Sequence, residues 1–288
     1  MQQTLINQPK LNSIGIMQGR LTPSNGRGIQ FFPFDSWEKE FQLAESIGLD
    51  EIEFIFDYDK YQDNPLWSES GLDRINNLIR THEMKINHIC ADFFMVKPFW
   101  ESKDQNINIL KKLIQSAVKI NAHNIEIPLV DNSSIKTKSQ RKILIDSLNE
   151  CLADIEKNKI TLSLETDLNA QDFLFLLEDF NHPFIRANYD SGNSSGLGYD
   201  HTQELKTFGS FIENVHIKDR ILNGSTVELG TGSADFNKVF KGLKEIGYNG
   251  SLIMQVVRGS DGSESNEVLS QIEFIKQYMI KYGFKTKK

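Results

Sequence analysis

Four short segments in the C-terminal half decide the fold: Thr161–Glu165 (TLSLE), Ile185–Asp190 (IRANYD), Asn214–Lys218 (NVHIK) and Ser251–Gln255 (SLIMQ). Each segment is a brief run of mainly apolar or β-branched residues that ends in a polar residue, a pattern typical of a buried strand. Similar segments precede them at Ser13–Gln18, Glu51–Phe56, Ile86–Ala91 and Asn124–Val130. The sequence therefore predicts eight strands.

Segments with helical periodicity lie between these strands. Trp37, Phe41, Ala44 and Ile47 are three or four residues apart, and Gly48 follows as a helix stop. The same spacing of apolar residues recurs over 107–118, 143–155 and 236–246, and a last helix is predicted over 267–282. The chain therefore alternates strands and helices along its whole length.

The spacing of the predicted strands favours a closed barrel. Divided among eight strands, 288 residues give about 36 per unit, which is close to the size of one βα unit. Parallel strands need crossover helices, and closure removes both exposed edges. The alternative, an open doubly wound sheet, usually carries GxGxxG after its first strand, whereas this chain has GRLTPSNGRG there. We therefore expect an α/β chain whose residues 1–288 form a single (β/α)8 barrel domain.

Composition excludes several classes of protein. The chain is 39% hydrophobic and 25% charged, with a net charge of −7 and no cluster of basic residues, which argues against a nucleic-acid-binding protein. No apolar run is long enough to span a membrane, and the N-terminal MQQTLINQPK lacks the apolar stretch of a secretory signal. Cys90 and Cys151 lack CxxC spacing, which argues against a disulfide scaffold or a cysteine zinc cluster. We expect a cytoplasmic protein.

Polar residues lie at or near the ends of four consecutive predicted strands, and barrel enzymes carry their chemistry at these ends. They are Glu165, Asp190, His216 and Gln255. Any one of them alone is more typical of a helix cap, a solvated loop or a hydrogen-bonded core residue. Together they predict one site for a divalent ion, Mn²⁺, Mg²⁺, Co²⁺ or Zn²⁺.

Further polar residues are expected around the same mouth. Lys218 lies two residues after His216 on the same strand, so both side chains share one face, and lysine can act as an acid or base. Basic residues suit a carboxylate or phosphate group on a substrate, although Asp219 and Arg220 could instead form a structural ion pair. The predicted substrate-binding residues are Gln18, Arg20, Asn193, Arg220 and Arg258.

The segments LSLETD, ANYDSGN, VHIKDR and GSLIMQ, in that order, resemble the second half of the xylose-isomerase-like barrel superfamily. The opening IGIMQGRLTP resembles the first strand of its sugar phosphate isomerase/epimerase branch, and the similarity runs from about Ile14 to Ile280. The resemblance implies one divalent ion bound by Glu165, Asp190, His216 and Gln255, and a carbohydrate substrate.

Two residues depart from the family pattern. The family's last ligand is Glu, which also transfers protons in ketose 3-epimerases, whereas Gln255 is neutral. Where the family often has Asp-x-x-His, this chain has Asn193, which does not shuttle protons near neutral pH. That asparagine and a total of six histidines argue against an endonuclease IV type of trinuclear site.

The resemblance implies a metal-dependent isomerase or epimerase that acts on a small sugar, sugar phosphate or keto-polyol through an enediolate. With Gln255 unable to take a proton, the candidate bases are Glu165, Lys218 and His88. A dehydratase of the inosose-dehydratase type and a non-catalytic sugar-binding barrel are the alternatives, and the Gln and Asn replacements favour the latter. The oligomeric state, including a homo-oligomer, stays open.

Overall fold

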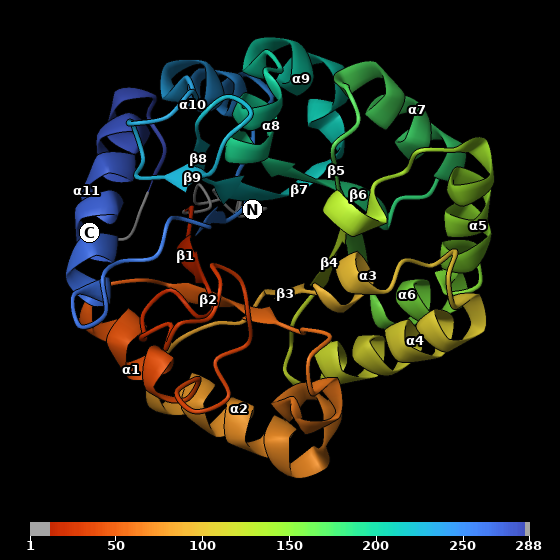
Figure 1. Cartoon of the computed structure of the whole chain (residues 1–288), viewed down its shortest axis with the longest axis horizontal. Helices are drawn as coiled ribbons and strands as arrows, with labels where there is room; N and C mark the ends of the chain where they lie inside the picture. The colour runs from red at the N-terminus through yellow and green to blue at the C-terminus, as the bar shows by residue number, and fades with distance from the viewer. Residues whose placement is uncertain (1–11, 286–288) are drawn as a thin grey trace, which may run out of the picture.

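Eight parallel strands close into a barrel in the computed structural model, which describes residues 12–285 (Figure 1). The strands are β1 (Ile14–Met17), β2 (Glu51–Ile55), β3 (His88–Cys90), β4 (Asn124–Leu129), β5 (Thr161–Thr166), β6 (Ile185–Asp190), β7 (Ile212–Ile217) and β10 (Leu252–Met254). They pair in the order β1-β10-β7-β6-β5-β4-β3-β2, and β1 pairs with β2 to complete the circle. The predicted (β/α)8 barrel is confirmed. The N-terminal MQQTLINQPK lies outside the described residues.

Helices surround the barrel on its outer side (Figure 1). They are α1 (Lys39–Ser46), α2 (Glu69–Thr81), α3 (Phe93–Val96), α4 (Lys103–Lys119), α5 (Lys138–Asn149), α6 (Leu152–Asn158), α7 (Ala170–Phe180), α8 (Ser191–Leu197), α9 (His201–Phe208), α10 (Phe236–Glu245) and α11 (Glu264–Lys281), with 3₁₀ turns η1 (Tyr61–Asp63), η2 (Pro65–Trp67), η3 (Asp131–Ser133) and η4 (Gly209–Phe211). The periodic segment 143–155 forms two helices, because the chain turns at Glu150 and Cys151 while the apolar face continues inward. None of the helices between residues 12 and 285 has the length and apolar character that crossing a bilayer requires.

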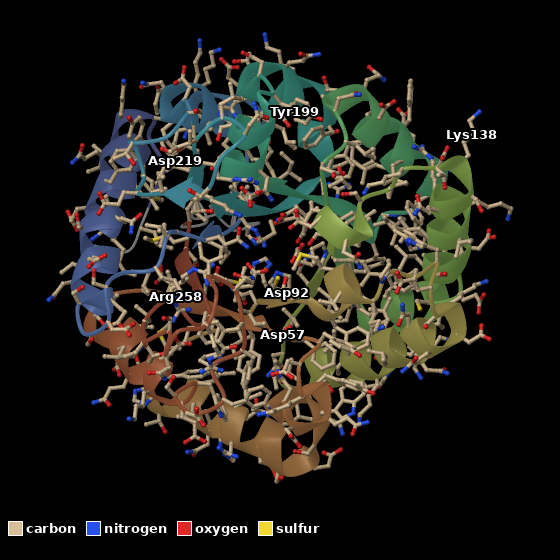
Figure 2. The ribbon with its side chains drawn as sticks, viewed as in Figure 1. Asp57, Asp92, Lys138, Tyr199, Asp219 and Arg258 are labelled. Atoms are coloured by element: carbon tan, nitrogen blue, oxygen red, sulfur yellow. The ribbon has the colours of Figure 1, made fainter. Side chains whose placement is uncertain are left out.

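A two-stranded hairpin follows β7 and was not predicted. It pairs β8 (Asp219–Arg220) with β9 (Thr226–Val227). The Asp219 carboxylate accepts hydrogen bonds from the backbone N–H groups of Gly230 and Gly232, both at 2.9 Å (Figure 2). Asp219 therefore holds this loop in place and does not pair with Arg220, contrary to one sequence-based interpretation.

The interior of the barrel is polar, whereas branched apolar residues usually fill the inside of this fold. Polar side chains hydrogen-bond inside it, for example Ser163 to Asn124 on the neighbouring strand (2.9 Å) and Asn214 to Glu53 across the barrel (3.1 Å). The apolar core instead lies between the strands and the helices, where residues such as Ile125 and Leu162 are fully buried. Apolar packing between the strands and the helices thus contributes most of the stability. The inside of the barrel can therefore hold polar side chains that bind or react.

One buried carboxyl group lies outside the barrel, between α8 and α9. Glu204 accepts a hydrogen bond from the hydroxyl of Ser194 at 2.9 Å, and its other carboxylate oxygen accepts none from the described residues and lies 3.8 Å from His201 Nδ1. Burial raises the pKa of Glu204 to about 8. In the folded chain the Glu204 carboxyl group therefore keeps its proton up to about pH 8, whereas in the unfolded chain it loses the proton near the usual glutamate pKa of about 4.3.

We predict that Glu204→Gln removes a pH-dependent part of the stability. The wild-type free energy of unfolding includes a contribution that falls as the pH rises from about 4.3 to about 8, because the folded state binds more protons there. Glutamine mimics the protonated carboxyl, so the variant should match wild type near pH 4 and exceed it by more than about 1 kcal/mol near pH 9. Urea unfolding at both pH values measures this, and parallel pH profiles of the two proteins would contradict it.

Candidate active site

Three of the predicted metal-binding residues meet at one point inside the barrel mouth. Glu165 lies near the end of β5, Asp190 ends β6 and His216 lies near the end of β7, and all three are buried. One ligand atom of each lies within 4.8 Å of the others. His216 Nδ1 is 3.1 Å from Glu165 Oε2 and 4.0 Å from Asp190 Oδ2. Two oxygens and one nitrogen, atom types that commonly bind divalent cations, thus lie close together.

A carboxylate on the far side of His216 orients its ring. Glu53 Oε2 is 3.1 Å from His216 Nε2, and the same oxygen accepts a hydrogen bond from Asn214 Nδ2 at 3.1 Å. When Nε2 donates its proton to Glu53, Nδ1 turns its lone pair toward Glu165 and Asp190. A carboxylate behind a histidine is the usual support of a metal-binding imidazole.

Asp190 combines a structural role with an oxygen that faces the site. Its Oδ1 accepts hydrogen bonds from the backbone N–H groups of Gly192 and Asn193, both at 2.8 Å, at the start of α8. This cap fixes the side chain and leaves Oδ2 pointing toward His216 and Lys218. The helix-cap interpretation and the ligand interpretation of Asp190 are therefore compatible.

The ionisation states of Glu165 and His216 depend on each other. Burial opposes the ionised form of Glu165, but the hydrogen bond and charge of His216 outweigh it and lower the pKa of the carboxyl group. Burial likewise opposes a charged His216, yet Glu53 and Glu165 raise the pKa of the ring well above its usual value. The imidazole therefore holds a proton between two carboxylates, and a divalent ion would take that proton's place.

Lys218 lies beside the three residues on the predicted face. Its Nζ donates hydrogen bonds to Gln255 Oε1 (2.8 Å), Asn193 Oδ1 (3.2 Å) and Asp190 Oδ2 (3.3 Å). Gln255 thus joins the site through the lysine, and its oxygen points to an ammonium group. Asn193 also donates from Nδ2 to Glu165 Oε1 at 2.6 Å, which ties the start of α8 to β5.

A cavity of about 500 Å³ opens over these residues. Its lining includes Glu165, Lys218 and Gln255, together with Arg20 and Arg220 from the predicted substrate-binding set. The three nitrogens of Arg20 all bind protein acceptors, namely the carbonyls of residues 256 and 29 and the side chain of residue 30. The guanidinium of Arg20 therefore fixes the wall of the cavity.

Three predicted site residues do not reach this cavity. Gln18 accepts a hydrogen bond from the Ile55 backbone N–H at 3.0 Å and links β1 to β2. Arg258 donates to the Thr22 carbonyl at 2.6 Å and lies outside the cavity lining (Figure 2). His88 begins the three-residue strand β3 and lines a separate cavity with His123 at the opposite end of the barrel.

Asp92, which the sequence places at the barrel mouth just after the third predicted strand, is a buried residue of the cavity lining. It follows β3, and β3 stands opposite β7 in the strand order. Burial and the neighbouring charge of Asp57 raise the pKa of Asp92 to about 7 (Figure 2). A carboxyl group that titrates near neutral pH therefore faces the same cavity as Lys218 from the opposite wall.

Comparison with known proteins agrees with the fold. The family model described as xylose isomerase-like TIM barrel matches residues 41–278. The L-ribulose-5-phosphate 3-epimerase UlaE of Escherichia coli O1:K1 / APEC is 26% identical over 262 residues, which cover 86% of this chain and 92% of that protein.

Solved structures share the fold at lower sequence identity. D-psicose 3-epimerase from Clostridium cellulolyticum H10, solved with D-tagatose, superposes with a TM-score of 0.70 at 14% identity, covering 93% of this chain and 99% of that one. The IOLI protein with a bound zinc atom has a TM-score of 0.68 at 17% identity, covering 94% and 97%. Together with the family match, which spans most of the sequence, these findings show that the chain belongs to the xylose isomerase-like TIM barrel family.

Proposed function

We propose that this chain is an epimerase or isomerase of a small sugar, sugar phosphate or keto-polyol, and that it uses one divalent ion held by Glu165, Asp190 and His216. The observation that carries the proposal is the convergence of these three buried ligand atoms beside Lys218 in the mouth cavity. The curated relatives, named as L-ribulose-5-phosphate 3-epimerases, support a sugar isomerase or epimerase. A divalent ion, when bound, would supply a Lewis acid for the substrate carbonyl and the enediolate charge.

The protein's own groups account for substrate positioning and proton transfer. Epimerisation removes a proton from one face of the carbon next to the carbonyl and returns one to the other face, so it needs acid and base groups on both sides. Lys218 follows β7, Asp92 stands opposite it after β3, and Glu165 on β5 lies between the two around the barrel. We assign the removal and the return of the proton to groups on these opposite sides of the cavity. His88 leaves the set because it faces the other end of the barrel.

Solvent-exchange measurements test this function directly. The protein is incubated in D₂O with Mn²⁺ and a panel of ketopentoses, ketohexoses and their phosphates, and the products are followed by NMR and mass spectrometry. We expect deuterium at the carbon next to the carbonyl and a product of unchanged composition. A product that has lost water would identify a dehydratase instead. Binding of a sugar without exchange would identify a non-catalytic barrel.

The metal site predicts a loss of Mn²⁺ binding in Glu165→Ala and His216→Ala. Each change removes one of three converging ligands, so the affinity for Mn²⁺ should fall at least about 100-fold while the fold persists. Equilibrium dialysis and circular dichroism measure the two quantities. Glu204→Gln, which removes a buried carboxyl outside the barrel, is the control and should bind Mn²⁺ like wild type. Equal Mn²⁺ binding by wild type and both site variants would refute the assignment.

Gln255→Glu should tighten the binding of Mn²⁺. The change adds a negative charge to a side chain whose oxygen is 2.8 Å from Lys218 Nζ, at the edge of the proposed site. Coulomb attraction at an effective dielectric constant of about 20 is worth a few kcal/mol at close range, part of which Lys218 absorbs, so we expect a gain on the order of tenfold. Calorimetric titration measures the affinity. An unchanged or weaker affinity would mean that residue 255 does not face the ion.

Lys218→Met tests the proton-transfer assignment. Methionine keeps most of the apolar stem and removes the charge, so Mn²⁺ binding should persist while turnover of the active sugar falls roughly 10²-fold or more. Deuterium incorporation at the carbon next to the carbonyl reports the chemical step itself. Lys241→Met, on the exposed face of α10, is the matched control and should exchange at the wild-type rate. Wild-type exchange in Lys218→Met would leave the base to Glu165 or Asp92.

A further inference from the structure

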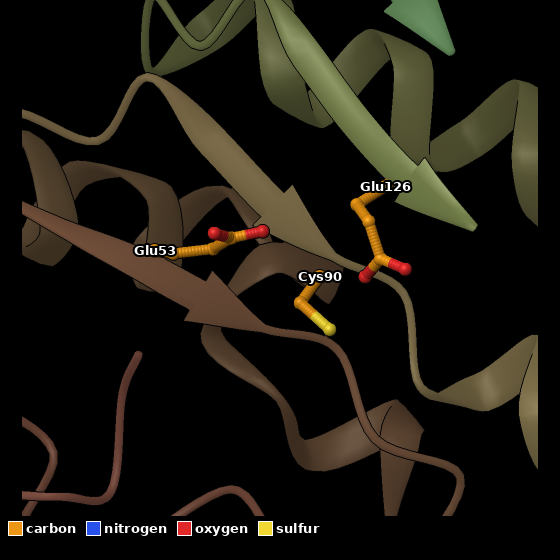
Figure 3. Close-up of side chains that lie close together, drawn as sticks. All are labelled: Glu53, Cys90 and Glu126. Carbon is orange, nitrogen blue, oxygen red and sulfur yellow. The ribbon is translucent and has the colours of Figure 1, made fainter. Parts of the chain in front are cut away.

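A second group of buried side chains lies in the barrel on the strands β2, β3 and β4 (Figure 3). Glu53, Cys90 and Glu126 point toward one another there, and each is at most 1% exposed. One ligand atom of each, a carboxylate oxygen or the sulfur, lies within 4.8 Å of the other two. This group shares no residue with Glu165, Asp190 and His216.

Glu126 is the member that the protein leaves unsatisfied. Neither of its carboxylate oxygens makes a hydrogen bond to the residues that the structure describes. The thiol of Cys90 donates to Asp92 Oδ1 at 3.4 Å. A buried, ionised carboxyl group without partners costs free energy, so Glu126 either holds a proton or has a cation beside it.

The acidic groups at Glu53, Cys90 and Glu126 favour the binding of a cation. Burial, followed by the carboxylate of Glu165, raises the pKa of Glu126 well above its usual value. Burial and the acidic neighbours likewise raise the pKa of the Cys90 thiol. Glu53 already shares its charge with His216. A bound cation would stabilise all three ionised groups at once.

We propose that Glu53, Cys90 and Glu126 form a second metal site, separate from the one assigned to Glu165, Asp190 and His216, that takes a borderline divalent ion such as Zn²⁺ or Co²⁺. One thiolate and two carboxylates form a ligand set that zinc and cobalt accept and that Mg²⁺ or Mn²⁺ binds poorly. Cys90 and Glu126 both line the mouth cavity, so an ion can enter there and keep one position open to solvent. On binding, the protons of the Cys90 thiol and of the Glu126 carboxyl group leave to water.

The sulfur gives the site a spectroscopic signature. Metal-free protein is titrated with Co²⁺ while absorption is recorded, because cobalt bound to a thiolate shows a charge-transfer band in the near ultraviolet. We expect this band in the wild type, and metal analysis should find a second ion per chain beyond the Mn²⁺-binding site. Cys90→Ser should lose both the band and that ion. Cys151→Ser is the matched control, since Cys151 is buried outside the barrel between α5 and α6, and it should keep both.

Two more variants separate this proposal from the proposed function. Glu126→Gln preserves the shape of the side chain, and we expect it to lose the charge-transfer band even where Cys90→Ser folds poorly. Glu165→Ala should lose Mn²⁺ binding and keep the band, so either site can fail without the other. Absence of the band in wild-type protein at saturating Co²⁺ would overturn the proposal. Persistence of the band in Cys90→Ser or in Glu126→Gln would overturn it as well.

Discussion

Negative charge buried inside the barrel is the constraint on which the rest of this structure depends. Glu53, Glu126, Glu165 and Asp190 are all at most 5% exposed. Buried carboxylates require nearby cations or protons, because the protein interior solvates an ion far less than water does. The chain meets this need through one imidazole, one ammonium group and a rigid frame of amide side chains. The proposed ions complete the balance.

The barrel topology explains how these charges serve function. Parallel strands bring residues that are distant in sequence to one mouth, so Asp190 and His216 become neighbours in the register of β6 and β7. The cap that Asp190 gives to α8 fixes the carboxylate that faces the site. A ligand that is held by backbone hydrogen bonds needs no reorganisation when an ion binds. The hydrogen bonds that fix Asp190 in the fold therefore also position it for the proposed ion.

Much of the fold and part of the site follow from the sequence alone. All eight strands were predictable, because short apolar runs between helical patterns leave few alternatives to a closed parallel barrel. Glu165, Asp190, His216 and Lys218 were predictable because polar residues interrupt those runs near their C-terminal ends. The hairpin β8–β9 was not, because its strands have only two residues each.

Other residues were beyond sequence reasoning for a physical reason. In β2 and β4, Glu53 and Glu126 alternate with apolar residues, but alternation alone does not reveal whether the polar face lies inside the barrel or under the helices. His88 illustrates the role of strand length: β3 starts at this residue, so the side chain lies at the wrong end of the barrel. Gln18 and Arg258 have suitable chemistry, but their hydrogen bonds to backbone groups hold the chain together.

The proposed function depends on a divalent ion that binds between Glu165, Asp190 and His216 in the mouth of the barrel. An anomalous difference map, measured at the manganese absorption edge on crystals soaked in Mn²⁺, tests it most directly. We expect a single strong manganese peak within bonding distance of His216 Nδ1 and the carboxylate oxygens of Glu165 and Asp190. A map without that peak, in which His216 still contacts both Glu53 and Glu165, would contradict it.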